Sequence, residues 1–282
     1  MMRPDLHMHS TFSDGTCTPW ELARLVQRAD VTMFSVTDHD TMAGLAQAAD
    51  AAYERGLAFL PGVEISTEGD EEVHILGYGV QQDDPVLSAF FQQMEEERIQ
   101  RFRTMGQRLL DLGYDLPLDE IMENAGASIG RPHLARALVA KGYARDIQDA
   151  FRRLIGKGCP AYVPRAYFAA SKAVTMLRER HAVPVAAHPG LIRWPQEKLT
   201  PMLDVWQDAG LMGMEVYHPA NQENYPMWDR IARERGLLVT GGSDYHDGTP
   251  GHGLIGETIP AWRTAGDDAW ALFEAVKKQK HT

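Results

Sequence analysis

The chain has 282 residues, of which 44% are hydrophobic and 24% charged, and 28 basic against 39 acidic side chains give a formal net charge of −11. A chain of this length can bury about 75% of its unfolded surface, so it needs no disulfide framework to fold, and it has only Cys17 and Cys159. The N-terminus shows no signal-peptide core and the chain has no run of ~18 apolar residues, which predicts a cytoplasmic protein without a membrane partner. The acidic balance argues against a general nucleic-acid coating protein.

Short apolar runs that end in polar residues recur along the chain, which is the pattern of buried strands in a parallel sheet. Thr18-Pro19, Thr41 and Asn221 precede amphipathic stretches between these runs, and Gly56 and Gly236 are stop signals for helices. The seven runs are residues 3–10, 33–40, 58–66, 72–80, 183–190, 213–219 and 237–246. Alternating strands and helices predict an α/β fold with a mainly parallel sheet, closed or nearly closed as a barrel, with functional groups at the strand C-termini.

The alternation stops between about residue 85 and residue 166. The sequence from Pro85 to Leu112 predicts one long helix ending at Gly113, and shorter helical pieces are expected near 117–125, 131–141 and 146–155. We therefore expect the first part of the barrel at residues 1–85, a helical cap insertion over the barrel rim at 86–165, and the second part of the barrel at 166–282. A last helix is expected at about 266–279.

Most of the eleven histidines stand at the ends of the predicted strands, where a barrel would bring them to one rim. The i, i+2 spacing of His7 and His9 on a strand points both rings to the same face. Imidazoles mixed with carboxylates suit Mn, Zn or Fe and not a thiolate-type site, so their convergence predicts a multinuclear metal site. The side chains expected at this rim are His7, His9, Asp14, Asp38, His39, Glu64, His74, His188, Glu215, His218, Asp244 and His246.

Eight short motifs that together cover most of the chain resemble the polymerase and histidinol phosphatase (PHP) superfamily. They are H-x-H (7–9), S-D-G (13–15), T-D-H-D (37–40), G-V-E-I (62–65), V-H-I-L-G-Y (73–78), R-P-H (131–133), A-H-P-G (187–190) and G-S-D-Y-H (242–246). The R-P-H element and a G-x-G-x-P-A-Y-V-P element in the insertion are similar to those of bacterial nucleoside 3',5'-bisphosphate phosphatases and small 5'-to-3' exoribonucleases. The resemblance implies a distorted (β/α)7 TIM-like barrel that holds three divalent metals. Mn2+ is our first expectation, with Zn2+ or Fe2+ as alternatives.

Carried over position by position, the resemblance implies nine metal ligands. A carboxylate shared by two metals offers two oxygens and offsets charge that would drive the cations apart. The first metal is assigned to His7, His9, Glu64 and Asp244, the second to Glu64, His74 and His188, and the third to Asp14, His39 and His246.

The candidate catalytic residues beside this set are Asp38 and His218. Asp38 flanks His39 and is expected to orient a ligand ring, not to bind metal itself. For Glu215 and His218, a phosphate-facing or proton-donating role and a plain polar rim remain equal alternatives.

Donors to the substrate phosphates are expected in the insertion. Arg131 and His133 follow Gly130 at a helix start, where backbone N–H groups also favour an anion. Arg98 and Arg101, spaced i, i+3 on the long helix, either lie over the barrel mouth or form a solvated face with neighbouring glutamates.

Clustered divalent metals acidify a bridging water, orient phosphate oxygens and stabilise the leaving oxygen, so the sequence predicts hydrolysis of a phosphate ester. The resemblance narrows this to a phosphatase for the 3'-phosphate of nucleoside 3',5'-bisphosphates, such as adenosine 3',5'-bisphosphate, which gives AMP. The alternatives are a 5'-to-3' exonuclease on short RNA or DNA, a histidinol-phosphate phosphatase, and a regulatory module that binds metal and nucleotide without turnover. The complete ligand set weighs against the last.

Charge is distributed unevenly along the chain. Residues 98–165 contain 12 Lys/Arg and 7 Asp/Glu, a net of +5, so the rest carries −16. A basic insertion above an acidic, metal-binding barrel favours a small, enclosed nucleotide over a long strand. We therefore expect a small nucleotide substrate and no stable nucleic-acid partner.

Overall fold

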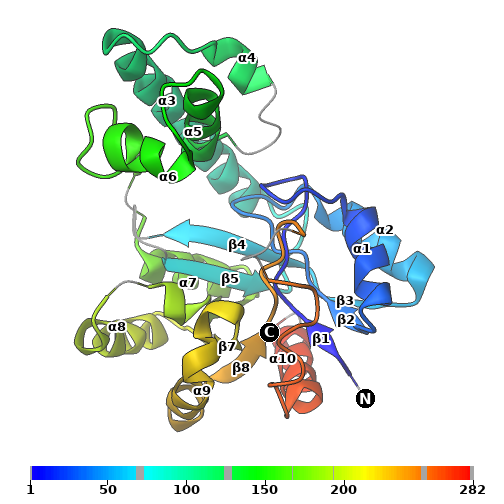
Figure 1. Ribbon diagram of the computed structural model, residues 1–282. Coiled ribbons are helices and arrows are strands. Elements are labelled where there is room, and N and C mark those ends of the chain that lie inside the picture. The colour runs from blue at the N-terminus through cyan, green and yellow to red at the C-terminus, as the bar shows by residue number, and fades with distance from the viewer. Residues whose placement is uncertain are drawn as a thin grey trace. The chain divides into compact units, whose positions relative to one another are not determined.

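The computed structural model describes residues 2–67, 73–123, 129–166, 168–192, 194–248 and 253–279. The chain forms two compact units, one of residues 1–88 and 167–282 and the other of residues 89–166 (Figure 1). The placement of the insertion as a cap over the barrel rim stays a prediction. None of the described helices is long and apolar enough to cross a bilayer.

The strands of the first unit form two sheets. A three-stranded parallel sheet joins β1 (Pro4–Asp5), β2 (Met33–Phe34) and β3 (Ala58–Phe59). A five-stranded sheet follows in the order β4 (Gly62–Thr67), β5 (Val73–Tyr78), β6 (Val183–Ala186), β7 (Gly213–Tyr217) and β8 (Leu238–Gly241). The run expected as one strand at 58–66 is thus two strands, because Pro61 between them has no N–H to donate to a ladder.

Most strand pairs are parallel, as the sequence predicts, and β5 is the exception. β5 pairs antiparallel with both β4 and β6, whereas β6, β7 and β8 are parallel to one another. Only residues 68–72 connect β4 to β5. A parallel pair needs a crossover of a dozen or more residues, so this short connection permits only an antiparallel pair.

The described strands do not form one closed sheet, which also differs from the expected barrel. Single parallel bridges join the two sheets instead, one between Met8 and Tyr245 and one between His39 and Glu64. Asp40 and Asp244, which adjoin these bridges, have φ values of 53° and 54°. Residues other than glycine rarely adopt this left-handed region, so the backbone turns sharply beside both bridges.

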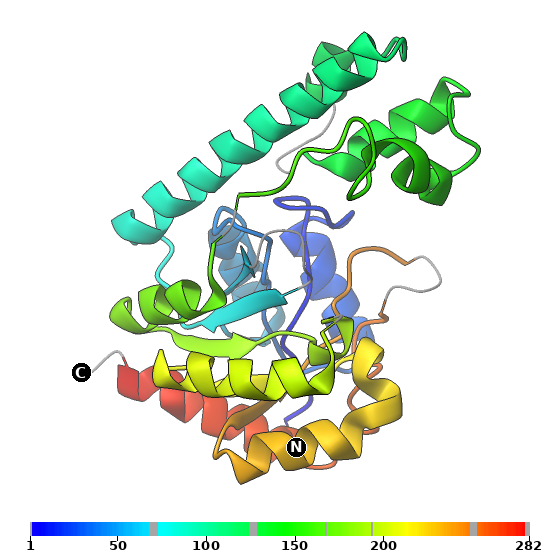
Figure 2. The same cartoon turned by 90° about the vertical axis from the view of Figure 1, so that its left-hand side faces the viewer.

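Helices cover the outside of both sheets (Figures 1 and 2). α2 contacts β3 and α1, α7 contacts β5 and β6, α9 contacts β7 and β8, and α10 contacts β6 and β8. These helices are α1 (Pro19–Arg28), α2 (Leu45–Arg55), α7 (Ala170–Glu179), α8 (Gln196–Asp208), α9 (Tyr225–Glu234) and α10 (Ala265–Gln279), with short turns η2 (Pro189–Leu191) and η3 (Pro219–Asn224).

Local sequence signals explain several helix boundaries. Thr18 and Glu21 form a reciprocal capping box at the start of α1, with Pro19 in its first turn. Gly56 ends α2 with φ 64°, in the left-handed region that glycine adopts without strain. The core under these helices contains Leu22, Val26, Phe34, Val36 and Ala48, all fully buried.

The second unit is helical, as the sequence predicts. It contains α3 (Pro85–Asp111), which begins in the first unit, α4 (Leu118–Glu123), α5 (Arg131–Ala140), α6 (Ile147–Ala150) and the π-turn η1 (Phe151–Ile155). Residues 124 and 125 of the expected helix at 117–125 lie outside the described residues. Its separate apolar core includes Phe102, Met105, Leu109, Leu134 and Leu138.

A buried carboxylate organises one end of the second unit. Asp149 accepts hydrogen bonds from Nη2 of Arg153 at 2.9 Å and from Nη2 of Arg152 at 2.6 Å, and its side chain is 3% exposed. The hydrogen bond from Arg153, followed by that from the backbone of Arg145, holds the pKa of Asp149 well below its usual range. This carboxylate therefore stays ionised at neutral pH.

Candidate metal centre

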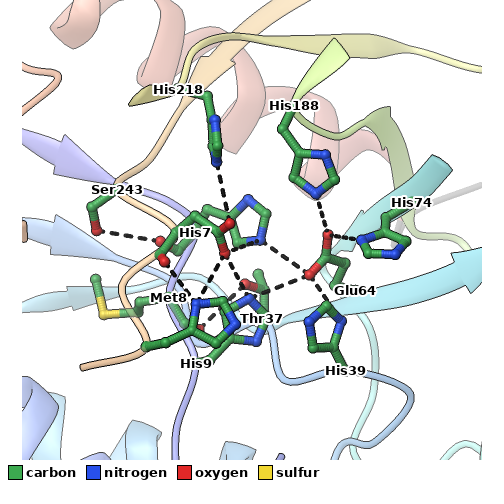
Figure 3. A network of polar contacts seen from close by, with 12 residues as sticks. His7, Met8, His9, Thr37, His39, Glu64, His74, His188, His218 and Ser243 are labelled. Carbon is green, nitrogen blue, oxygen red and sulfur yellow. Dashed lines mark hydrogen bonds and ion pairs between the residues drawn. The ribbon is translucent and has the colours of Figure 1, made fainter. Parts of the chain in front are cut away.

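Histidine and carboxylate side chains from distant parts of the chain meet in the first unit (Figure 3). His7 and His9 follow β1, Glu64 lies on β4, His74 on β5, and the remaining side chains come from connections near strand ends. The ring centroids of His7 and His9 are 5.2 Å apart. Parallel strand ends explain most of this convergence, while His74 arrives on the antiparallel strand β5.

Glu64 is the centre of the cluster. It is fully buried, and its Oε1 lies 2.8 Å from Nε2 of His188 and 2.9 Å from Nδ1 of His74 (Figure 3). Its Oε2 lies 3.1 to 3.3 Å from three more ring nitrogens, those of His39, His7 and His9. One carboxylate thus touches five imidazoles.

Two further carboxylates complete the cluster. Oδ1 of Asp244 lies 3.0 Å from Nε2 of His9 and 3.3 Å from Nε2 of His7. Asp14 is on the outer side, with Oδ1 3.4 Å from Nε2 of His246 and Oδ2 3.9 Å from Nε2 of His39. Asp14 is 45% exposed, whereas Asp244 is 19% exposed.

The ligand atoms fall into three sets, within each of which all atoms lie within 4.8 Å of one another. The sets are His7, His9, Glu64 and Asp244; His39, Glu64 and His74; and His9, Asp14, His39 and His246. The first has the membership that the resemblance implies. In the second, His39 stands where His188 was expected, although Nε2 of His188 is only 2.8 Å from Glu64. His9 and His39 each belong to two sets.

The chemistry of these atoms fits bound divalent cations. Nε2 of His9, Nδ1 of His39 and Oδ1 of Asp244 are buried and make no hydrogen bond, although each faces ligand atoms of the cluster. Leaving such an atom unsatisfied costs about 1 to 3 kcal/mol, and that cost disappears if the atom coordinates a cation. The set contains imidazoles and carboxylates without thiolates, as Mn, Zn or Fe prefers.

The pKa shifts of the cluster residues are also consistent with a site for cations. Burial raises the pKa of Glu64, but His39, His7 and His74 lower it by more, so its pKa lies well below the usual range. Burial lowers the pKa of His9, but Asp244 and Glu64 raise it further, to about 10. For His39 burial prevails over the attraction of Glu64 and lowers the pKa to about 4. The carboxylates thus favour positive charge beside His9, as they would favour a bound cation.

Asp38 lies behind a candidate ligand ring, in the kind of place that the sequence predicts, and the ring is that of His9. Asp38 is 2% exposed, and it accepts hydrogen bonds of 2.7 Å from the backbone N and the Oγ of Ser10 and from Oγ of Ser13. Oγ of Ser13 lies 3.5 Å from Nδ1 of His9. Asp38 thus anchors the loop after His9 and reaches that ring through Ser13, so its bonds do not run to the adjacent His39.

His218 is held in one orientation at the edge of the cluster. Its Nδ1 accepts a hydrogen bond from the backbone N–H of Ala220 at 3.0 Å, and its Nε2 lies 3.3 Å from Oδ2 of Asp244. A neutral imidazole whose Nδ1 is an acceptor carries its proton on Nε2. The proton of His218 therefore points toward Asp244.

Glu215 faces neither solvent nor an open rim. It is fully buried; its Oε1 accepts from Nδ1–H of His7 at 2.9 Å, and its Oε2 accepts from the backbone N–H of His188 at 2.8 Å. Both alternatives that the sequence left open for Glu215 are therefore wrong. A lone glutamate in an apolar strand gives no sequence signal for contacts with residues so distant in the chain.

Sequence reasoning also missed the groups that hold the backbone behind the ligands. Asp5 is fully buried and accepts from the backbone N–H of Ser243 at 2.9 Å and of Gly256 at 2.7 Å. A Cβ at Gly242 would lie 2.4 Å from Cβ of His7. The glycine of the G-S-D motif is the one available signal, since it permits this close approach.

The expected phosphate contacts all lie in the second unit. Nε of Arg101 donates to the carbonyl O of Val163 at 2.8 Å, and the guanidinium of Arg131 lies 5.5 Å from the ring centroid of Phe151. Nδ1 of His133 accepts from the backbone N–H of Gly130 at 3.2 Å. Arg98 is half-buried on α3. A phosphate-binding role for these four side chains stays a prediction.

Comparisons with known proteins agree with this chemistry. The model of the PHP domain matches residues 5–158. The 3',5'-nucleoside bisphosphate phosphatase of Chromobacterium violaceum is 34% identical over 93% of this chain and 96% of its own. The 5'-3' exoribonuclease Rnm of Escherichia coli is 32% identical over 96% of this chain and 93% of its own. A crystal structure from Bifidobacterium adolescentis, described as a metal-dependent phosphoesterase, is 31% identical and superposes with a TM-score of 0.80 over 97% of this chain and 96% of that one.

Proposed function

We propose that this chain, which belongs to the PHP domain family, is a nucleotide phosphatase. It would remove the 3'-phosphate of nucleoside 3',5'-bisphosphates and so convert adenosine 3',5'-bisphosphate to AMP. The chain is a metal-dependent hydrolase of phosphoesters, and the proposal concerns its substrate. One observation carries it: the bisphosphate phosphatase from Chromobacterium violaceum aligns with almost the whole chain, insertion included.

Nine side chains would hold the metals, which we propose to be three divalent ions, Mn2+ before Zn2+ or Fe2+. The ligand sets are those that the resemblance implies: His7, His9, Glu64 and Asp244; Glu64, His74 and His188; and Asp14, His39 and His246. When bound, such ions lower the pKa of a coordinated water and offset the charge of phosphate oxygens. We also propose that β1, β2 and β4 to β8 are the seven strands of a distorted (β/α)7 barrel, which the two single bridges between the sheets would close.

The exposure of the ligands supports one direction of substrate approach. Asp14 is 45% exposed, and His246 and Asp244 are 20% and 19% exposed. His7 and Glu64 are fully buried. The phosphate therefore enters past Asp14, and the ligands behind it keep water away from the inner side of the cluster.

His218 would supply a proton to the leaving oxygen. Its Nε2 proton faces the cluster, because Nδ1 is occupied by the backbone N–H of Ala220. Asp244, with Oδ2 3.3 Å from Nε2, holds that proton at the cluster, where a leaving oxygen could accept it. Asp38 would act as a positioning residue through Ser13, and not as a catalytic residue.

The insertion would bind the part of the substrate that does not react. We propose Arg98, Arg101, Arg131 and His133 as contacts for the second phosphate, which the net charge of +5 over residues 98–165 favours. The proposed partner is a small nucleotide, not a stably bound nucleic acid.

Steady-state hydrolysis tests the substrate. The metal-free protein is reloaded with Mn2+ and given adenosine 3',5'-bisphosphate, AMP, histidinol phosphate and a short 5'-phosphorylated RNA, with phosphate or nucleotide release as the readout. We expect kcat/KM to be highest for the bisphosphate and the product to be AMP. Turnover of the RNA alone would refute the proposal.

A 5'-to-3' exonuclease is the second candidate, because the exoribonuclease from Escherichia coli aligns with as much of this chain as the phosphatase does. Both reactions need a phosphate on the same metals, and they differ in what lies beyond it. An exonuclease requires room for the following nucleotides, so its kcat/KM would rise from a dinucleotide to a hexanucleotide. A phosphatase for bisphosphates would show no such rise.

A further inference from the structure

Glu215 is a buried carboxylate in the middle of β7 that links two parts of the candidate metal centre. One oxygen binds the ring of His7 and the other binds the backbone of His188, which lie 181 positions apart in the sequence. We propose that Glu215 is a positioning residue that sets both metal ligands at once and thereby fixes the two ligand sets that meet at Glu64. This inference rests on the proposed metal centre.

The first link determines which nitrogen of His7 can bind metal. Glu215 is an acceptor, so Nδ1 of His7 keeps its proton and donates it at 2.9 Å. Nε2 is then the nitrogen with the available lone pair, and it lies 3.2 Å from Oε2 of Glu64 and 3.3 Å from Oδ1 of Asp244. A carboxylate behind a ligating imidazole fixes the tautomer, aims the ring and raises its basicity.

The second link restrains a strained turn. His188 has φ 24° and ψ 63°, a conformation that residues other than glycine rarely adopt. Its N–H donates to Oε2 of Glu215 at 2.8 Å, while Nε2 of its ring lies 2.8 Å from Glu64. The surrounding structure has to hold such a backbone in place, and Glu215 is a direct contact that does so.

Asn221 extends the same support to the turn that follows. Its Oδ1 accepts from the N–H of Gly190 at 2.7 Å, and its Nδ2 donates to the carbonyl O of Glu215 and of Val216 at 2.9 Å each. β7 thus holds the turn at 188–190 directly through the side chain of Glu215, and through Asn221, which is bound to the carbonyls of Glu215 and Val216.

An apolar side chain at position 215 would serve the folding of β7 at least as well as glutamate does. β7 is buried on both faces, and its neighbours Met214 and Val216 are fully buried and apolar. Burying a carboxylate there is unfavourable unless charged or polar partners compensate it. The two partners of Glu215 are the metal ligands themselves, so the compensation comes from the centre that the residue orders.

Glu215→Gln tests the inference, because glutamine keeps the size of the side chain but has one acceptor where glutamate has two. It can accept from His7 or from His188, and its NH2 group then faces the other donor. We expect the metal affinity to fall about 10- to 100-fold. The absorption spectrum of the Co2+-loaded protein should change, and kcat should fall more than KM changes. Affinity is measured by competition with a chelator, independently of turnover.

Asp268→Asn is the matched control. Asp268 is also a buried carboxylate of the first unit, and it accepts hydrogen bonds from Arg233, Trp262 and Thr264 but touches no candidate ligand. This variant should unfold at a lower temperature without its metal, yet bind metal with wild-type affinity and give the wild-type Co2+ spectrum. An equal loss of affinity in both variants would overturn the inference, since general destabilisation would then explain it.

A second variant keeps the test decisive if Glu215→Gln does not fold. Glu215→Asp retains the buried charge but withdraws both oxygens by about 1.5 Å, the length of one C–C bond. Wild-type metal affinity and an unchanged Co2+ spectrum in either variant would overturn the inference. If the wild-type protein binds metal but leaves the bisphosphate intact, the proposed substrate fails while the inference stands.

Discussion

Asp244→Asn removes the charge of a candidate metal ligand while it keeps the shape of the side chain, so it tests the contribution of that charge to metal binding. Asp244 has φ 54°, and asparagine tolerates this left-handed region as well as aspartate does, so the backbone should not move. The side chains have the same size. The carboxylate contacts Nε2 of His9 at 3.0 Å, Nε2 of His7 at 3.3 Å and Nε2 of His218 at 3.3 Å. The substitution therefore removes one negative charge from the set of His7, His9, Glu64 and Asp244.

The size of the effect follows from the charge that remains. The set has two carboxylates, so its formal charge falls from −2 to −1 when Asp244 becomes neutral. Removing one partner from a buried charge pair costs about 3 to 5 kcal/mol. At 1.4 kcal/mol per factor of ten, this is about 100-fold to about 4,000-fold in metal affinity. Because Asp244 is 19% exposed, water replaces part of the interaction, and we expect a value near the lower end.

Metal affinity by chelator competition and kcat/KM at a fixed, limiting Mn2+ concentration measure this loss. Raising the Mn2+ concentration should restore part of the activity, because the defect is in binding. Asp30→Asn is the control, since Asp30 has a similar φ of 58°, is 85% exposed and pairs only with Arg3 among the ion pairs of the described residues. Wild-type affinity in Asp244→Asn, or an equal loss in Asp30→Asn, would refute the reasoning.

Two more predictions address the support of the site and the second unit. Gly242→Ala should weaken metal binding at least tenfold in a chelator titration, because the new Cβ would lie 2.4 Å from Cβ of His7 and displace that histidine. Gly248→Ala is the control: its Cβ would meet no atom within 4 Å, so this variant should bind metal like the wild type. Asp149→Asn should lower the free energy of unfolding at neutral pH, because the carboxylate is ionised there and Arg153 and its neighbours hold its pKa below the ordinary 3.8. A group with a depressed pKa stabilises the fold above its unfolded pKa, so the difference between wild type and variant should be full above about pH 4 and shrink as the pH falls further, as measured by urea unfolding. A difference that stays constant down to pH 2 would contradict the assignment of this pKa.

The sequence alone predicted the features that depend on neighbouring residues. Thr18, Pro19 and Glu21 start α1 because a capping box needs only three adjacent positions, and α3 ends at Asp111 because Gly113 follows. The three sets of ligand atoms contain eight of the nine side chains expected as ligands, and the ninth, His188, contacts Glu64. Their types and their places at strand ends carried that information, as did the motifs that resemble the PHP superfamily.

Only the tertiary structure decided how these pieces meet. The antiparallel pairing of β5 brings His74 to Glu64, and two parallel bridges, Met8–Tyr245 and His39–Glu64, connect the two sheets. The same is true of Asp38, which reaches His9 through Ser13, and of Glu215, which orders His7 and His188. Each of these contacts joins residues that share no local pattern, and their geometry depends on the folding of the whole chain around Glu64. Short-range sequence signals therefore specify which groups are present, whereas long-range packing determines which of them touch.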